Sequence, residues 1–117
     1  MTMFGLTVRW SLEGVAPGVA TELRDFVRDR SLDRFTDMPG LRFKTWRMVD
    51  GEWFEGTYVW ESAAARDAFA ESDRAGIADA PGTRIIGAPP VLHEVFEVVG
   101  VAEGAAGFTT GIGPGRS

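Results

Sequence analysis

The sequence predicts a single small α+β domain whose elements run strand, helix, strand, strand, helix, strand. Residues 3–10 alternate apolar side chains with others, as a half-buried strand does. Residues 17–36 and 63–72 instead repeat apolar side chains every three or four positions, as amphipathic helices do. Residues 41–61 contain two strand-like runs around Asp50-Gly51, a dipeptide typical of hairpin turns.

The first strand is expected to bury one face, because its apolar residues occur at every second position. These residues are Phe4, Leu6, Val8 and Trp10. Pro17 suits the first turn of the helix that follows, and Pro39-Gly40 ends that helix.

The Asp50-Gly51 dipeptide predicts a two-residue turn of type I′, which determines how the two strands pair. Met48 then opposes Trp53, and Trp46 opposes Glu55. The other face, which we expect to point toward the helices, pairs Arg47 with Phe54, Thr45 with Gly56, Phe43 with Tyr58 and Leu41 with Trp60.

In the second half of the chain, Ser62 is a good N-cap for the second helix. Residues 73–90 are rich in Gly and Pro and are predicted to be an irregular connection. Long connections of this kind are often functional, so this segment is expected to be a mobile lid. Val91–Val99 forms the last strand, with His93 and Val95 on one of its faces.

Two right-handed crossovers that put both helices on one face of the sheet produce a ferredoxin-like arrangement. The opposite face would then expose a large apolar patch made of Trp46, Met48, Trp53 and Val59. We therefore expect a symmetric homodimer in which two sheets pack face to face. Residues 1–100 would form this domain, and residues 101–117 a Gly/Ala-rich tail.

Composition excludes several classes of function. The net charge of −5 argues against nucleic acid as a partner, because phosphate-backbone binding needs a basic surface. There is no cysteine and only one histidine, so no thiolate chemistry and no metal centre rich in histidine is expected. Without an apolar run long enough to span a bilayer or a secretory signal, no membrane partner is expected, and we predict a cytoplasmic protein.

Several local motifs resemble one known family. Pro39-Gly40-Leu41 is followed by Lys44-Thr45-Trp46, then by Glu55-Gly56-Thr57-Tyr58, and then by a helix that opens Ser62-Ala-Ala-Ala-Arg-Asp-Ala-Phe69. This pattern is similar to that of the YdhR-type monooxygenase-like proteins of the dimeric α+β barrel superfamily, to which the antibiotic biosynthesis monooxygenases also belong. The resemblance covers roughly residues 3–99.

The resemblance implies a homodimer with one pocket per subunit, between sheet and helices. It also implies oxidation of a small aromatic or polyketide-like substrate by molecular oxygen, with no cofactor and no metal. Some relatives use an Asn-Trp-Arg set for this chemistry. Trp46 and Arg47 are present in this chain, which contains no asparagine.

The candidate catalytic residues are Tyr58, Arg47 and His93, which would orient and polarise the substrate. Tyr58 is a hydrogen-bond donor near neutral pH, and His93 is the side chain whose ordinary pKa suits a general base. Arg47 could pair with a substrate carboxylate or enolate. The candidate substrate-binding residues are Phe43, Thr45, Trp46 and Trp60.

Each candidate also has a structural interpretation. Trp46 could pack in the dimer interface, and Arg47 could be solvated near the hairpin tip. His93 could be a structural or solvated residue of the last strand. Lys44 and Glu55 are expected to form an interfacial ion pair. Two other functions remain open: a non-oxidative enzyme such as a cyclase, isomerase or decarboxylase, and a ligand-binding dimer without catalytic activity.

Overall fold

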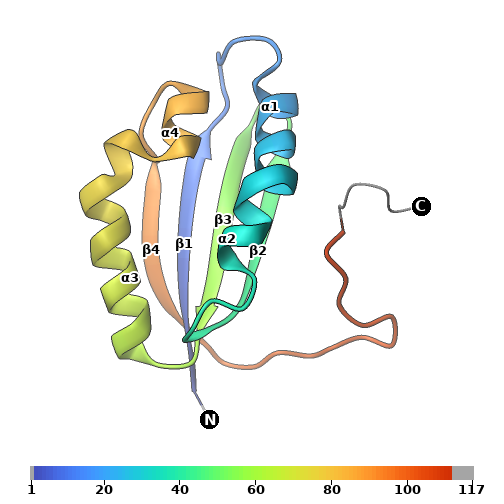
Figure 1. The fold of residues 1–117 in the computed structure, drawn as a ribbon, viewed down its shortest axis with the longest axis vertical. Coiled ribbons are helices and arrows are strands. Elements are labelled where there is room, and N and C mark those ends of the chain that lie inside the picture. The colour runs from blue at the N-terminus through green and yellow to red at the C-terminus, as the bar shows by residue number, and fades with distance from the viewer. Residues whose placement is uncertain (1, 112–117) are drawn as a thin grey trace.

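The structure is a computed structural model that describes residues 2–111. The elements lie along the chain in the predicted order (Figure 1). Helices connect the first strand to the second and the third strand to the fourth. They are β1 (Met3–Ser11), α1 (Val19–Phe26), a π-helical stretch (Val27–Ser31), α2 (Leu32–Phe35), β2 (Leu41–Val49), β3 (Trp53–Trp60), α3 (Ala63–Gly76), a 3-10 turn (Ile77–Asp79), α4 (Pro81–Ile86) and β4 (Leu92–Val98).

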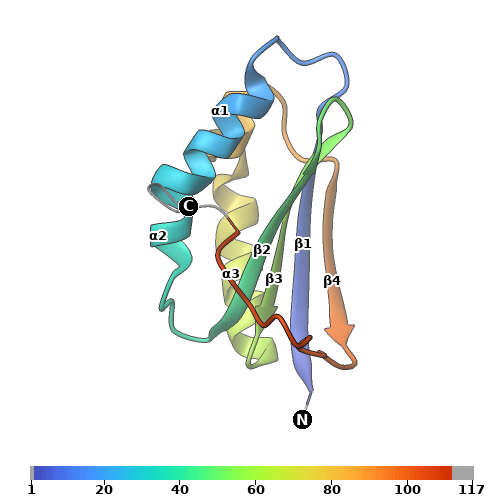
Figure 2. The same cartoon turned by 90° about the vertical axis from the view of Figure 1, so that its right-hand side faces the viewer.

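The four strands form one antiparallel sheet in the order β2-β3-β1-β4. All helices of residues 2–111 lie on one face of this sheet, and no helix of that part of the chain covers the other face (Figure 2). This arrangement confirms the predicted ferredoxin-like α+β fold.

The central strand β1 supplies much of the core, as its alternating pattern predicts. Leu6, Val8 and Trp10 are buried beneath the helices, and Phe4 packs at the edge of the same cluster. Glycine at position 5, on the other face, lets the Phe96 ring of β4 lie directly over the strand, because an added Cβ would lie 2.0 Å from Cε1 of that ring.

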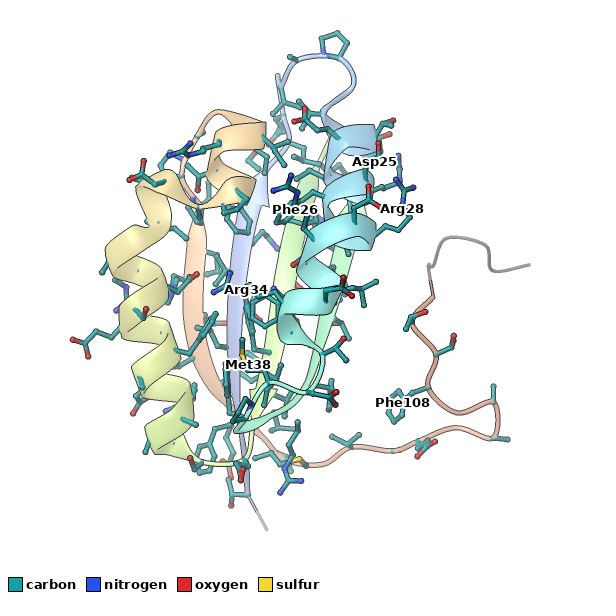
Figure 3. All side chains as sticks on the ribbon, in the orientation of Figure 1. Asp25, Phe26, Arg28, Arg34, Met38 and Phe108 are labelled. Atoms are coloured by element: carbon teal, nitrogen blue, oxygen red, sulfur yellow. The ribbon has the colours of Figure 1, made fainter. Side chains whose placement is uncertain are left out.

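The first helical segment is continuous from Val19 to Phe35, two residues shorter at its start than the predicted segment. Its buried positions recur every four residues at Leu23, Val27, Ser31 and Phe35. One face of the segment therefore packs against the sheet. Figure 3 shows Arg34 pointing from α2 into the space above the sheet, whereas Asp25 and Arg28 project outward.

The hairpin turn differs from the prediction, and the strand register changes with it. Val49 pairs with Trp53, so the loop has three residues and not two. Gly51 has a φ of +78°, while Asp50 is not among the residues with positive φ, so the turn is of type II and not of type I′. The Glu52 backbone donates to Val49, and its carbonyl accepts a 2.9 Å hydrogen bond from Leu12, which holds Glu52 outside the β2–β3 ladder.

The one-residue change of register moves the side chains of residues 43–49 to the opposite face, whereas an irregularity between Leu41 and Phe43 restores the predicted pairing of Leu41 with Trp60. Trp46 now opposes Gly56, and Lys44 opposes Tyr58, both pairs facing the helices. Arg47 opposes Glu55 on the face without helices. The predictions that Trp46 and Met48 lie on the face away from the helices, and that Arg47, Thr45 and Phe43 face them, are therefore wrong.

The prediction that residues 73–90 are irregular is also wrong, because most of this segment is helical, while its role as a mobile lid stays a prediction. Pro81 begins α4 and Gly87, with a φ of +90°, ends it. Thr83 is buried and accepts a 3.1 Å hydrogen bond from Nε1 of Trp10. This hydrogen bond attaches α4 to the central strand.

Beyond β4, residues 99–111 form no helix or strand and extend past the β2 edge of the sheet (Figures 1 and 2). The Phe108 side chain points back toward the domain in Figure 3, and its ring stacks on Phe43 with centroids 6.1 Å apart. The division into a domain of residues 1–100 and a tail of residues 101–117 stays a prediction, and residues 112–117 lie outside the described part of the chain.

Candidate functional site

A cavity of about 50 Å³ lies between the sheet and the helical layer, and we call it the inner cavity. Strands β1, β2 and β3 form one wall, while the opposite wall comes from the first helical segment, α3 and α4. The lining residues that matter for chemistry are Arg34, Phe35, Lys44, Trp46, Tyr58 and Asp73. The cavity therefore combines aromatic rings with charged groups of both signs.

Three aromatic rings meet on the β2 side of the inner cavity. Phe35 packs edge-on against both Tyr58 and Trp46, with ring centroids 5.5 and 6.0 Å apart. Trp60 stacks on the far side of Tyr58 with centroids 6.3 Å apart and does not line the cavity. Tyr58 and Trp46 are thus the two predicted site residues that the structure places in this cavity.

Lys44 is the only lysine in the chain, and its amine lies among these rings. Its Nζ atom is 3.6 Å from the ring centre of Phe35, 4.3 Å from that of Tyr58 and 4.5 Å from that of Trp46. Within residues 2–111, no carboxylate forms an ion pair with Lys44. The expected Lys44–Glu55 pair is wrong, because the two side chains lie on opposite faces of the sheet.

Gly56 makes room for this lysine on the neighbouring strand. An added Cβ at position 56 would lie 3.1 Å from Cε of Lys44 and 3.5 Å from the Tyr58 hydroxyl oxygen. The lysine stem and the tyrosine hydroxyl therefore converge over the backbone of β3.

The environment changes the acidity of both groups. Burial lowers the pKa of Lys44 well below its ordinary value, Arg34 lowers it further, and Asp73 acts in the opposite direction. Burial likewise raises the pKa of Tyr58, with Asp73 adding to the increase and Arg34 opposing it. The site therefore favours an uncharged amine and a protonated phenol at the same place.

His93 does not line the inner cavity but contacts a residue that does. Its Nε2 lies 3.4 Å from Oδ2 of Asp73, and its Nδ1 lies 2.9 Å from a guanidinium nitrogen of Arg74. Because arginine only donates, Nδ1 is the acceptor, and the proton of the neutral ring is on Nε2, which faces Asp73. His93 can thus influence the cavity through Asp73.

Arg47 belongs to a different cluster on the face without helices. It donates from Nε to Oε2 of Glu55 at 2.8 Å, and Arg9 donates to Oε1 at 2.9 Å from Nε and 2.7 Å from Nη2. Arg47 also donates from Nη2 to Oε2, and Thr57 donates a fifth bond to this carboxylate, which is only 1% exposed. Burial opposes ionisation of Glu55, but the hydrogen bonds from Arg47, Arg9 and Thr57 outweigh it and lower its pKa.

An open groove runs along the β2 edge, and we call it the outer groove. One part, of about 280 Å³, lies between β2 and α2. The other part, of about 670 Å³, is bordered by Thr45 and by residues 108–111. Lys44 and Trp46 line both parts and the inner cavity, so these two side chains form the wall between the groove and the interior.

Sequence reasoning missed Lys44, Arg34, Phe35 and Asp73 as site residues. Their positions depend on the hairpin register and on helices that bring residues from distant segments together. One signal was nevertheless visible in the sequence. A chain with twelve Lys and Arg residues in total holds a single lysine, and that lysine lies two positions from Trp46 in a strand.

Neither a metal-binding cluster nor a membrane-spanning helix is found in residues 2–111. Residues 2–111 contain no group of three or more His, Asp or Glu side chains placed to hold a metal ion. Over the same residues, no helix has the length and apolar character needed to cross a lipid bilayer.

Comparison with known proteins identifies the fold. No family model and no curated protein matches the sequence. Among solved structures, a protein of unknown function from Nitrosomonas europaea shares 22% identity with a TM-score of 0.66, over 90% of this chain and 97% of that chain.

Two other similar structures are linked to oxygenation. A candidate antibiotic biosynthesis monooxygenase from Chloroflexus aurantiacus J-10-fl shares 23% identity with a TM-score of 0.57, over 86% of this chain and 96% of that one. A monooxygenase from the gene ActVA-Orf6 of Streptomyces coelicolor, in complex with nanaomycin D, shares 19% identity with a TM-score of 0.55, over 87% of this chain and 92% of that one. The chain thus has the ferredoxin-like α+β fold found in antibiotic biosynthesis monooxygenase-like proteins.

Proposed function

We propose that this protein is a cofactor-independent monooxygenase that oxidises a small, planar, acidic aromatic or polyketide-like substrate in the inner cavity. The observation that carries the proposal is the Lys44 amine, which lies among three aromatic rings without a carboxylate partner in residues 2–111. Flat aromatic surfaces suit a planar ring, and a lone amine suits the acidic group of that ring. The resemblance to YdhR-type proteins and the similar monooxygenase structures support the same reaction class.

The substrate first has to lose a proton. An uncharged Lys44 amine can accept it from a phenol or enol, and the resulting ammonium then stabilises the anion at short range. Tyr58 keeps its proton, so its hydroxyl can donate a hydrogen bond to the same oxygen or to a developing peroxide. Arg34 adds a second positive charge at the cavity wall.

The anion then supplies the electrons. The carbon that shares the negative charge, which carries one hydrogen, bonds to O₂ and takes up a proton to become a hydroperoxide. Loss of that hydrogen as a proton, with cleavage of the O–O bond, gives a new carbonyl and one molecule of water, so no external reductant is consumed. The protein has to hold the ring, stabilise negative charge and keep water away from the reacting carbon. All three tasks are assigned to residues that line the inner cavity.

A planar substrate needs more space than the inner cavity provides. Trp46 separates that cavity from the outer groove, so rotation of its indole would join the two volumes. We place the substrate entrance there, between β2 and α2.

Oxygen consumption tests the proposal. Planar phenols, hydroquinones and nanaomycin D, the ligand of the Streptomyces coelicolor monooxygenase, are first screened for an increase in melting temperature. Hits are then followed with an oxygen electrode in the presence of a chelator. We expect uptake by the wild type and by the surface variant Arg28→Gln, and a loss of at least tenfold in Lys44→Met and Tyr58→Phe. Binding without oxygen uptake for every hit would reject the monooxygenase and leave a ligand-binding protein.

We also propose that two copies associate through the sheet face without helices. This face presents Trp53, whose ring centre lies 4.1 Å from the guanidinium carbon of Arg9 and 5.3 Å from that of Arg47. Phe96 lies on the same face over Gly5. Light scattering should give twice the chain mass of 12.7 kDa, and Trp53→Glu should shift the protein toward monomer. A wild-type monomer at micromolar concentration would contradict this assembly.

A further inference from the structure

The only primary amine on a side chain of this protein lies inside the inner cavity. Eleven of the twelve Lys and Arg residues are arginine, which carries no nucleophilic amine near neutral pH. The one lysine, Lys44, lies in a partly buried position next to the phenol of Tyr58. A lysine with these surroundings can do more than balance the charge of a substrate.

We infer that Lys44 is a nucleophile that forms an imine with a planar aromatic aldehyde or ketone, which binds where rotation of Trp46 joins the inner cavity to the outer groove. This inference uses the cavity of the proposed monooxygenase but requires no oxygen. It rests on three features of the geometry: a single lysine without a carboxylate partner in residues 2–111, a ring-lined space for an aryl group, and proton donors and acceptors at the same wall.

The first step needs an amine that is uncharged. An ordinary lysine at pH 7 is uncharged in less than about 0.1% of molecules, because its pKa is roughly 10.4. Loss of hydration and the positive charge of Arg34 both disfavour the ammonium form of Lys44. Asp73 and the three rings favour the ammonium form. The effect of burial is larger than that of Asp73, so the pKa of Lys44 is lowered.

The bond changes are those of a condensation. The Lys44 nitrogen forms a bond to the carbonyl carbon, and the π electrons of the C=O bond move to oxygen, which takes up a proton. The carbinolamine then loses this oxygen as water while the nitrogen loses a proton, leaving C=N. The net reaction is R–CHO plus the lysine amine giving the imine plus water, without any oxidant or reductant.

The groups around Lys44 match these proton transfers. The Tyr58 hydroxyl is protonated and lies over Gly56 beside the lysine stem, so it can donate to the departing oxygen. Asp73 lines the same cavity and can accept the proton released from nitrogen.

Reductive trapping tests the inference. The protein is incubated without oxygen with 4-hydroxybenzaldehyde and cyanoborohydride at pH 7, and peptide mapping by mass spectrometry locates the secondary amine. An internal reference is a lysine introduced on the surface by Arg30→Lys, since position 30 is exposed on the helical segment. We expect Lys44 to be labelled at least ten times faster than this reference lysine.

Two variants make the result specific. Lys44→Arg keeps a positive charge and should leave no adduct on that peptide, with the fold checked by circular dichroism. Arg34→Gln removes the neighbouring cation and should move the pH profile of labelling toward higher pH. Labelling of Lys44 no faster than the surface reference, or labelling confined to the N-terminal amine, would overturn the inference.

The outcome is separable from that of the proposed function. Oxygen uptake with no adduct would leave the monooxygenase standing and reject the imine. An adduct in a protein that takes up no oxygen would support the imine, reject the monooxygenase and favour a non-oxidative carbonyl enzyme.

Discussion

The Nζ atom of Lys44 lies 4.3 Å from the centre of the Tyr58 ring. These residues are the only lysine and the only tyrosine in the chain, and they come from adjacent strands of the sheet. Burial shifts the pKa of each group toward its uncharged form, lowering that of the amine and raising that of the phenol. Each group can therefore be followed by a signal that no other side chain contributes.

Tyr58 gives the first prediction, because tyrosinate absorbance reports this residue alone. The pKa of the hydroxyl is raised above 10.0 in the folded protein. The unfolded chain therefore loses this proton first, and the stability that Tyr58 contributes is complete below about pH 10 and decreases as the pH rises further. An absorbance titration should show tyrosinate appearing above the ordinary range and together with alkaline unfolding. A reversible transition near pH 10 in the folded protein would contradict the burial of this hydroxyl.

Lys44 gives a prediction of the opposite sign. The folded-state pKa of the amine is below 10.5, so the unfolded chain binds the additional proton between the two values. Stability contributed by this group therefore rises with pH across that window, and the penalty is complete below the folded-state pKa. Lys44→Met should raise the free energy of unfolding by about 1–2 kcal/mol at pH 7 and flatten this part of the pH profile. Urea titrations from pH 6 to pH 10 measure both effects, with Arg28→Gln as a surface control.

Glu55 is a buried carboxylate held by Arg9, Arg47 and Thr57. Its pKa is lowered from 4.5, so its stabilising contribution is present above about pH 4.5 and is lost as the pH falls through the folded-state value. Glu55→Gln leaves two arginines near each other without their partner and should cost about 3 kcal/mol at pH 7. The variant should also lose less stability than the wild type between pH 6 and pH 3. Chemical denaturation at each pH checks this, and equal acid sensitivity in both proteins would show that the cluster contributes little.

Thr83 anchors α4 by accepting a hydrogen bond from the indole of Trp10. Thr83→Val keeps the shape of the side chain but leaves the buried Nε1 without an acceptor, so we expect a loss of about 1–2 kcal/mol. Thr83→Ser, which retains the hydroxyl, should lose less. Hydrogen exchange in residues 81–86 should increase in the valine variant. Unchanged exchange would indicate that this hydrogen bond does not hold α4 in place.

Much of the fold could be predicted from local patterns. The alternation from Phe4 to Trp10 identifies β1 and its buried face, and Ser62 marks the start of α3, where its hydroxyl accepts a hydrogen bond from the Ala65 backbone. The first helical segment was also predicted through its whole length. Residues 73–90 were assigned wrongly because Gly and Pro are common in irregular loops, whereas in this segment they begin and end a short helix.

Less of the site could be predicted. Tyr58 and Trp46 were expected at the pocket, and both line the inner cavity. Arg47 and Phe43 were expected beside them but lie on the other face, because the hairpin turn contains one more residue than Asp50-Gly51 predicts. The catalytic roles of Tyr58 and His93 remain predictions that the experiments above address.

The sequence by itself determined the order of strands and helices, the buried face of β1 and the presence of a single lysine, tyrosine and histidine. These properties depend on composition and on contacts between neighbours along the chain. Only the tertiary structure decided which side chains share the inner cavity. A shift of one residue in pairing turns every side chain of a strand to the opposite face, and a hydrogen bond from Leu12, far along the chain, helps to set that pairing at Glu52. Arg34 and Asp73 join Lys44 for a similar reason, because helices packed on the sheet bring distant segments together.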